Sequence, residues 1–142
     1  MNRPSSPLLY GLLVIVYFSF ISFISHIPGE QLQRVDVQIW DKLAHVLLYM
    51  PLGFIFALML RARDMEKATP SPKHAVNRAW RIGFAVLFFA GLATIDECHQ
   101  YFVPSRTASF LDGVADVVGG LLGMLCEKLR HDRFRSRDLP GS

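Results

Sequence analysis

The feature that most constrains the fold is an apolar run near the N-terminus. Residues 8–24 contain no charged side chain over 17 positions. A helix there would be apolar on every face, whereas a helix on the surface of a soluble protein shows an apolar stripe. About 20 apolar residues in a helix cross the roughly 30 Å hydrocarbon core of a bilayer. We therefore predict a membrane span, and we expect it to be retained because no A-x-A-like cleavage site follows it.

Three further apolar blocks occupy residues 44–60, 82–95 and 110–126. We predict an all-α, polytopic membrane protein with four transmembrane helices, at about 8–25, 42–61, 80–98 and 109–127. The length of 142 residues indicates a single membrane domain, 1–142, with a basic C-terminal tail at 128–142. The alternative is a small soluble helical bundle, which the uniformly apolar runs disfavour.

The basic residues predict which way the chain faces. Cytoplasmic connections of membrane proteins carry an excess of Lys and Arg. If both termini and the connection between the second and third spans share one side, that side holds twelve of the fifteen basic residues. We therefore expect both termini to be cytoplasmic. The basic tails are ordinary for such a protein, favour contact with membrane lipids, and do not indicate nucleic-acid binding.

Polar side chains concentrate where the second span begins, the third ends and the fourth begins. The predicted topology brings these three helix ends to one depth at the outer membrane face. A carboxylate inside a span is costly unless it is paired, hydrated or protonated. The pattern therefore predicts a polar pocket that opens to the outside. Its candidate residues are Asp41, Lys42, His45, Asp96, Glu97, His99, Gln100, Arg106, Asp112 and Asp116.

Helical spacing adds detail to the fourth span. Asp112 and Asp116 are four residues apart and share a face, which continues through Gly119 and Gly123. The two glycines form a GxxxG pattern, which lets another helix approach closely in a membrane. We expect the face that carries the aspartates to pack inward, and an oligomer could also form through the Gly119 and Gly123 face.

Some of these residues also have purely structural interpretations. Asp41 could simply begin a helix, because acids favour a helix N-terminus. Ser109 with Asp112 three residues later resembles a capping box in which Asp replaces the usual Glu. Lys42 and Arg106 could extend toward lipid head groups.

Two segments carry motifs that resemble the VanZ family. They are DKLAHVLLYMPLGF at 41–54 and DECHQYFVPSRTASFLDGVADVVGGLLG at 96–123. The first contains a D-K-x-x-H-x-x-x-Y pattern. The second contains D-E-x-x-Q-x-F-x-P-x-R, a later Asp and a run of small residues. Members of this family are small bacterial membrane proteins, and the founding member is associated with resistance to the glycopeptide teicoplanin.

The resemblance implies a multi-pass protein of the bacterial cytoplasmic membrane. Two positions depart from the family pattern: Asp116, where many relatives have Asn, and Ser105, where Gly often precedes the Arg. The additional negative charge of Asp116 is expected to change the ion preference of the pocket. The family's characteristic polar residues fall on Asp41, Lys42, His45, Asp96, Glu97, Gln100, Arg106 and Asp112.

The first function that fits this pattern is ligand binding in cell-envelope homeostasis or glycopeptide resistance. The protein would bind an envelope lipid or a lipid-linked cell-wall intermediate at its outer face. Lys42 and Arg106 are the residue types that hold a phosphate. The predicted ligand-binding residues are Asp41, Lys42, Asp96, Gln100, Arg106, Asp112 and Asp116.

Two alternatives stay open. The first is an intramembrane enzyme, hydrolase-like or phosphatase-like, that acts on a phosphorylated or glycosylated lipid. His45 and Glu97 would be its catalytic residues. Glu97, Asp112 and Asp116 are candidate oxygen ligands for a divalent cation, although no linear hydrolase signature is present. The other alternative is an ion or proton pathway, which the gathering of polar residues at one membrane side disfavours.

Overall fold

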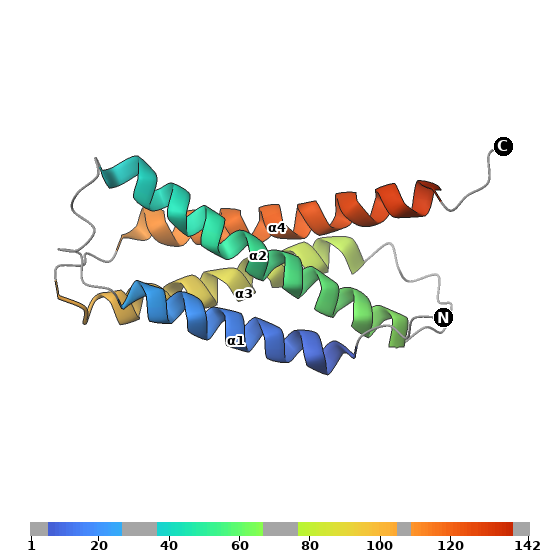
Figure 1. The fold of residues 1–142 in the computed structure, drawn as a ribbon, viewed down its shortest axis with the longest axis horizontal. Helices are drawn as coiled ribbons and strands as arrows, with labels where there is room; N and C mark the ends of the chain where they lie inside the picture. Colours follow the sequence, from blue (N-terminus) through green and yellow to red (C-terminus); the bar gives the residue numbers. More distant parts are fainter. Residues whose placement is uncertain (1–5, 27–36, 67–76, 105–108, 138–142) are drawn as a thin grey trace.

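The computed structural model describes residues 6–26, 37–66, 77–104 and 109–137 (Figure 1). Over these ranges the chain forms four helices and no strand, which confirms the prediction of an all-α protein. The helices are α1 (Pro7–Ser25), α2 (Val37–Glu66), α3 (Asn77–Gln100) and α4 (Phe110–Arg137). The first part of the predicted basic tail is helical, because α4 continues as far as Arg137.

Three helices are long and apolar enough to cross a membrane, with candidate spans at Pro7–Ser25, Trp40–Met65 and Trp80–Gln100. The chain is therefore a multi-pass membrane protein. α4 is not among the candidates, although it has 28 residues. Its apolar stretch also contains three acids, Asp112, Asp116 and Glu127.

The helices alternate in direction along the bundle (Figure 1). α1 and α3 run one way, and α2 and α4 run the other way. The end of α1, the start of α2, the end of α3 and the start of α4 therefore lie together at what we call the site end. The two parallel helices, α2 and α4, make the most extensive helix contact in the described bundle.

Glycines allow α2 and α4 to touch at their backbones. A Cβ atom on Gly119 would overlap the backbone of Val46, and one on Gly123 would overlap the backbone of Met50. The buried face of α4 carries both glycines together with the two aspartates, as the helical spacing predicts. The glycines thus serve the contact between α2 and α4 of the same chain. Association of two copies through this face stays a prediction.

The described core lies midway along the bundle. Tyr49, Leu52 and Phe56 of α2 are fully buried there, and Phe89 of α3 packs against them. The Phe56 ring stacks on Phe88 with 4.4 Å between the ring centroids. These side chains separate the site end from the opposite end of the bundle.

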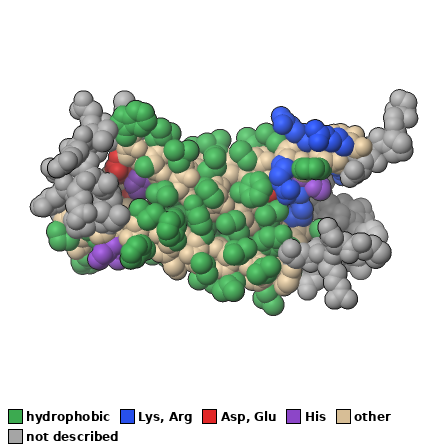
Figure 2. Space-filling view, in the orientation of Figure 1, with side chains coloured by type: hydrophobic (Ala, Val, Ile, Leu, Met, Phe, Trp, Pro, Cys, Tyr) green, Lys and Arg blue, Asp and Glu red, His purple; other side chains and the backbone are tan. Residues whose placement is uncertain are grey.

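The outer surface between the two ends is apolar. Figure 2 shows hydrophobic side chains over the middle of the molecule and Lys and Arg side chains gathered near the end of α4. Large exposed side chains include Leu8, which is 83% exposed, and Leu87, which is 70% exposed. An apolar surface this extensive is unusual for a soluble monomer, whereas lipid covers it in a membrane.

Candidate functional site

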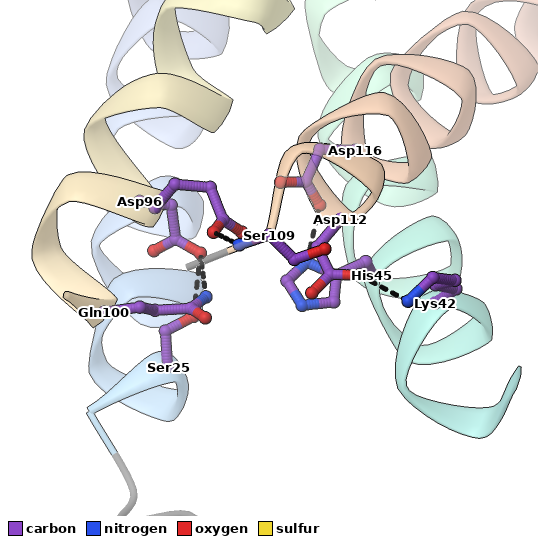
Figure 3. Close-up of polar contacts among 9 residues, drawn as sticks. Ser25, Lys42, His45, Asp96, Gln100, Ser109, Asp112 and Asp116 are labelled. Atoms are coloured by element: carbon purple, nitrogen blue, oxygen red, sulfur yellow. Dashed lines mark hydrogen bonds and ion pairs between the residues drawn. The ribbon is translucent and has the colours of Figure 1, made fainter. Parts of the chain in front are cut away.

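Eight of the predicted site residues lie on helix segments that meet at the site end. Figure 3 shows side chains from α2, α3 and α4 turned toward one another, with Ser25 of α1 beside them. The eight are Asp41, Lys42 and His45 of α2, Asp96, Glu97 and Gln100 of α3, and Asp112 and Asp116 of α4. Of the two other candidates, His99 lies near the end of α3 and is exposed, and Arg106 lies outside the described residues.

Two polar pairs connect α2 with α4. Lys42 Nζ donates to Asp112 Oδ1 at 3.1 Å, and His45 Nδ1 and Asp116 Oδ1 form a hydrogen bond of 2.9 Å. Lys42 and His45 are one helical turn apart, as are Asp112 and Asp116, so the parallel helices align both pairs. His45, Asp112 and Asp116 are 6%, 4% and 0% exposed. The carboxylate bonded to His45 is that of Asp116, a predicted ligand-binding residue, whereas Glu97, the other predicted catalytic residue, bonds Ser109.

Asp96 connects α3 with α1. Its Oδ2 accepts hydrogen bonds from Ser25 Oγ at 2.9 Å and from Gln100 Nε2 at 3.0 Å. Asp96 and Gln100 are four residues apart on α3 and therefore share a helix face, which allows their hydrogen bond. Ser25 was not predicted. A single hydroxyl at the end of an apolar run gives little signal, because serine is common at helix ends.

Glu97 connects α3 with the start of α4. Its Oε2 accepts a hydrogen bond of 2.6 Å from the backbone N–H of Ser109, which directly precedes α4. A capping box would have satisfied this N–H with Asp112. The capping-box expectation is wrong here, because Asp112 turns to Lys42 and an acid from another helix takes its place.

Four buried polar atoms at or near the site end have no hydrogen-bond partner among the described residues. They are Tyr49 Oη, Asp96 Oδ1, Glu97 Oε1 and Asp116 Oδ2. Buried polar atoms are normally paired, and an unpaired buried carboxylate oxygen is costly. Charge does not balance either, because five acids face one lysine and one histidine among the eight residues. The described site end therefore lacks positive charge and hydrogen-bond donors.

Two sets of side chains are close enough to share a metal ion. One ligand atom each of His45, Asp96 and Asp116 lie within 4.8 Å of one another, and the same holds for Asp41, His45 and Asp112. The metal ligands predicted from sequence, Glu97, Asp112 and Asp116, do not form either of these sets. Asp112 and Asp116 belong to separate sets, and Glu97 belongs to neither.

A histidine pair joins the ends of α1 and α3. His26 Nδ1 and His99 Nε2 lie 3.1 Å apart, and both side chains are exposed. Nothing in the sequence predicts this pair, because 73 positions separate the two histidines along the chain. The pair supplies only two ligand atoms, so it stabilises the contact between helix ends without forming a binding site of its own.

An apolar groove lies between α3 and α4, beside the polar cluster. It has a volume of about 580 Å³. Small and aliphatic side chains line most of its length, and Glu97, Tyr101 and Ser109 line the end nearest the cluster. The apolar lining includes Ala90, Ala93, Gly113, Val114, Val117 and Val118. Sequence reasoning missed the groove because it arises where two faces of small residues fail to fill the space between the helices.

The opposite end of the bundle contains a second buried acid that sequence reasoning missed. Glu127 of α4 is 2% exposed. Arg61 Nη2 of α2 donates to Glu127 Oε2 at 2.8 Å, and Arg61 Nη1 forms an ion pair with Oε1 at 2.8 Å. Arg130 Nη2 donates to Oε1 at 3.3 Å. The four-residue spacing from Gly123 to Glu127 was the available signal, because it extends the inward face of α4.

Together, the apolar spans and the polar cluster at their ends define a class: multi-pass α-helical membrane proteins with a polar site built from helix termini. Within that class, the chain matches the VanZ/LLP1 family model over residues 7–131 and belongs to this family. The match includes every described site residue. Comparisons with curated proteins and with solved structures gave no match.

Proposed function

We propose that all four helices cross the bacterial cytoplasmic membrane, with α4 as the fourth span. The acids in the apolar stretch of α4, Asp112, Asp116 and Glu127, are 4%, 0% and 2% exposed. They therefore face neighbouring helices, where an intramembrane acid is tolerated, and not lipid. The exposed face of the same stretch is apolar, with Val114, Val118, Leu122 and Leu125.

We infer that both termini are cytoplasmic and that the site end faces outward. The support is the distribution of Lys and Arg, of which twelve among fifteen lie in residues 1–7, 61–81 and 128–142. The alternating helix directions bring the start of α1, the end of α2, the start of α3 and the end of α4 to one end of the bundle (Figure 1). The polar cluster then opens on the outer face of the membrane.

In this orientation we propose that the protein binds an envelope lipid, with the chain of the lipid in the groove and its head group at the polar cluster. The observation that carries this proposal is the 580 Å³ apolar groove that ends at Glu97. Ligand sites combine a mostly apolar wall with a few convergent polar groups, and this groove has that composition. Its position along two membrane helices suits an acyl or prenyl chain that enters sideways from the bilayer.

The polar cluster favours a head group that offers hydroxyls and a phosphate. Glu97 Oε1 is a hydrogen-bond acceptor without a donor, which a sugar or glycerol hydroxyl would supply. Lys42 is the most exposed member of the two α2–α4 pairs, with 36% of its side chain accessible, and its ammonium can also reach a phosphate. A phosphorylated or glycosylated envelope lipid has both groups. Binding such a lipid would support envelope homeostasis, and altered glycopeptide susceptibility would be one consequence.

Photo-crosslinking tests this proposal. The protein in nanodiscs is incubated with a lipid that carries a diazirine in its chain, and the labelled peptides are identified by mass spectrometry. Gly113→Leu places a side chain in the groove, where ordinary contact with Ala93 already begins at 3.8 Å. A lipid chain that must pack against the new leucine is overpacked, which weakens its binding by about 1–3 kcal/mol. We therefore expect labelling of the α3 and α4 peptides to fall about tenfold.

Gly91→Leu is the matched control, because a Cβ at Gly91 meets nothing within 4 Å. It should label like the wild type. Equal labelling in Gly113→Leu and Gly91→Leu, or labelling spread evenly over all four helices, would contradict lipid binding in the groove.

A second candidate function is lipid hydrolysis, which the His45–Asp116 pair favours. A buried carboxylate bonded to Nδ1 orients an imidazole and leaves Nε2 to act as a base, which is a common arrangement in hydrolases. A panel of phosphorylated envelope lipids, with and without Mg²⁺ or Mn²⁺, separates the two functions. Phosphate release that disappears in His45→Ala supports the enzyme, whereas saturable binding without release supports the binding module.

A further inference from the structure

We propose that His45, Asp96 and Asp116 hold a divalent cation where α2, α3 and α4 meet. One ligand atom from each lies within 4.8 Å of the others. Atoms that coordinate one ion at about 2.0–2.2 Å lie about 3–4 Å apart, so modest side-chain movement closes the set around an ion. The three side chains are 6%, 0% and 0% exposed, which means that the protein itself builds and encloses the site.

The two buried carboxylates of this set are incompletely paired, which points independently to a ligand. Asp96 Oδ1 and Asp116 Oδ2 are buried and accept no hydrogen bond from the described residues. The other oxygen of each carboxylate is fixed, Asp96 Oδ2 by Ser25 and Gln100 and Asp116 Oδ1 by His45. Carboxylates that ligate a metal are themselves oriented by hydrogen bonds, as both of these are. The unpartnered Oδ2 of Asp116 lies on the side of α3 in Figure 3 and is free for an ion.

The charges match a doubly charged ion. The donors to Asp96, Ser25 and Gln100, are neutral. The nearest lysine among the described site residues, Lys42, bonds Asp112 one turn away from Asp116. Two buried carboxylates with a neutral imidazole carry a charge of −2, which a divalent cation neutralises.

The ligand types select the class of ion. Imidazole with two carboxylates suits first-row transition ions and zinc, whereas Mg²⁺ and Ca²⁺ prefer oxygen ligands alone. We therefore expect Mn²⁺ or Zn²⁺ to bind more tightly than Mg²⁺. The neighbouring set of Asp41, His45 and Asp112 is less suited to an ion, because Asp112 already pairs with Lys42.

Metal content of the purified full chain tests the site. After chelation, desalting and reloading with Mn²⁺ or Zn²⁺, we expect about one tightly held ion per chain by elemental analysis. Asp96→Asn and Asp116→Asn keep side-chain size and should each weaken binding at least about tenfold, since even the loss of a supporting group costs 10–100-fold. Asp64→Asn at the opposite end is the control and should bind like the wild type.

Spectroscopy keeps the test decisive if a variant fails to fold. Pulsed electron paramagnetic resonance of the Mn²⁺-loaded wild type should show coupling to an imidazole nitrogen. The proposal is overturned by less than stoichiometric retention, by unchanged affinity in both Asn variants, or by a bound ion without nitrogen coupling. The site does not depend on lipid binding, so the crosslinking result and the metal result can fail separately.

Discussion

The two ends of the α2–α4 contact bury acids in different ways. At the opposite end, Glu127 meets two arginines, and both of its oxygens accept hydrogen bonds. At the site end, five acids face one lysine and one histidine, and three carboxylate oxygens have no partner among the described residues. Both ends hold acids that are almost fully buried. The difference teaches that burial of an acid does not by itself call for a partner from outside the chain, whereas an unmet oxygen on a buried acid needs an explanation.

The largest expected effect comes from separating α2 and α4, which would break both ends together. Gly123→Leu forces a side chain into the backbone of Met50. We expect a loss of at least about 3 kcal/mol in the free energy of unfolding, at the upper range for overpacking. Titration with sodium dodecyl sulfate measures it. Gly91→Leu, which faces open space, should lose less than about 0.5 kcal/mol. Similar losses in both variants would show that the close α2–α4 contact is absent.

The next effect concerns the opposite end alone. Arg61→Met removes the arginine that binds both oxygens of Glu127. Removing one partner of a buried pair commonly costs 3–5 kcal/mol. Because Arg130 remains, we expect about 2 kcal/mol. The double variant Arg61→Met/Glu127→Leu should regain most of the loss, because no charge stays buried. If the double variant is less stable than Arg61→Met, the end has a role beyond mutual neutralisation.

At the site end, removal of a charge should leave the free energy of unfolding unchanged or increase it. In protein stripped of metal, Asp116→Asn eliminates an uncompensated buried charge but keeps the side-chain shape. We expect stability equal to the wild type or up to about 1 kcal/mol higher. Thermal unfolding in chelator provides the measurement. A loss of 2 kcal/mol or more without metal would mean that the chain itself already satisfies Asp116.

The smallest expected effect is at Tyr49, whose hydroxyl is buried without a partner. Tyr49→Phe removes an unsatisfied polar atom, so the free energy of unfolding should change by less than about 1 kcal/mol. The informative readout is lipid crosslinking. Unchanged labelling indicates that the hydroxyl is only a packing atom, whereas reduced labelling at unchanged stability would place it in contact with the ligand.

The sequence predicted which helix ends carry the polar residues better than it predicted which side chains bond to one another. Asp112 and Asp116 are four residues apart and continue into Gly119 and Gly123, so the inward face of α4 could be predicted from spacing alone. The partners could not, because pairing Lys42 with Asp112 and His45 with Asp116 requires the relative register of α2 and α4. That register depends on contacts between glycines and backbone, which are not visible in a single sequence.

Other features depended on long-range contacts in the same way. Ser25 bonds Asp96 across 71 positions, and Glu97 bonds Ser109 across a connection that is only partly described. The capping-box expectation failed because local spacing took no account of an acid from α3. Glu127 was overlooked because the basic residues that follow it made this region resemble a solvated tail.

The most direct test of the central claim is an experimental density map of the full chain at high resolution, in lipid and with Mn²⁺ present. The claim is that the site end needs a partner from outside the chain and the opposite end does not. We predict a non-protein peak within about 2.5 Å of a carboxylate oxygen of both Asp96 and Asp116, with anomalous signal for manganese, and none at Glu127. Empty space between the two aspartates, or their closure onto donors of the chain itself, would contradict the claim.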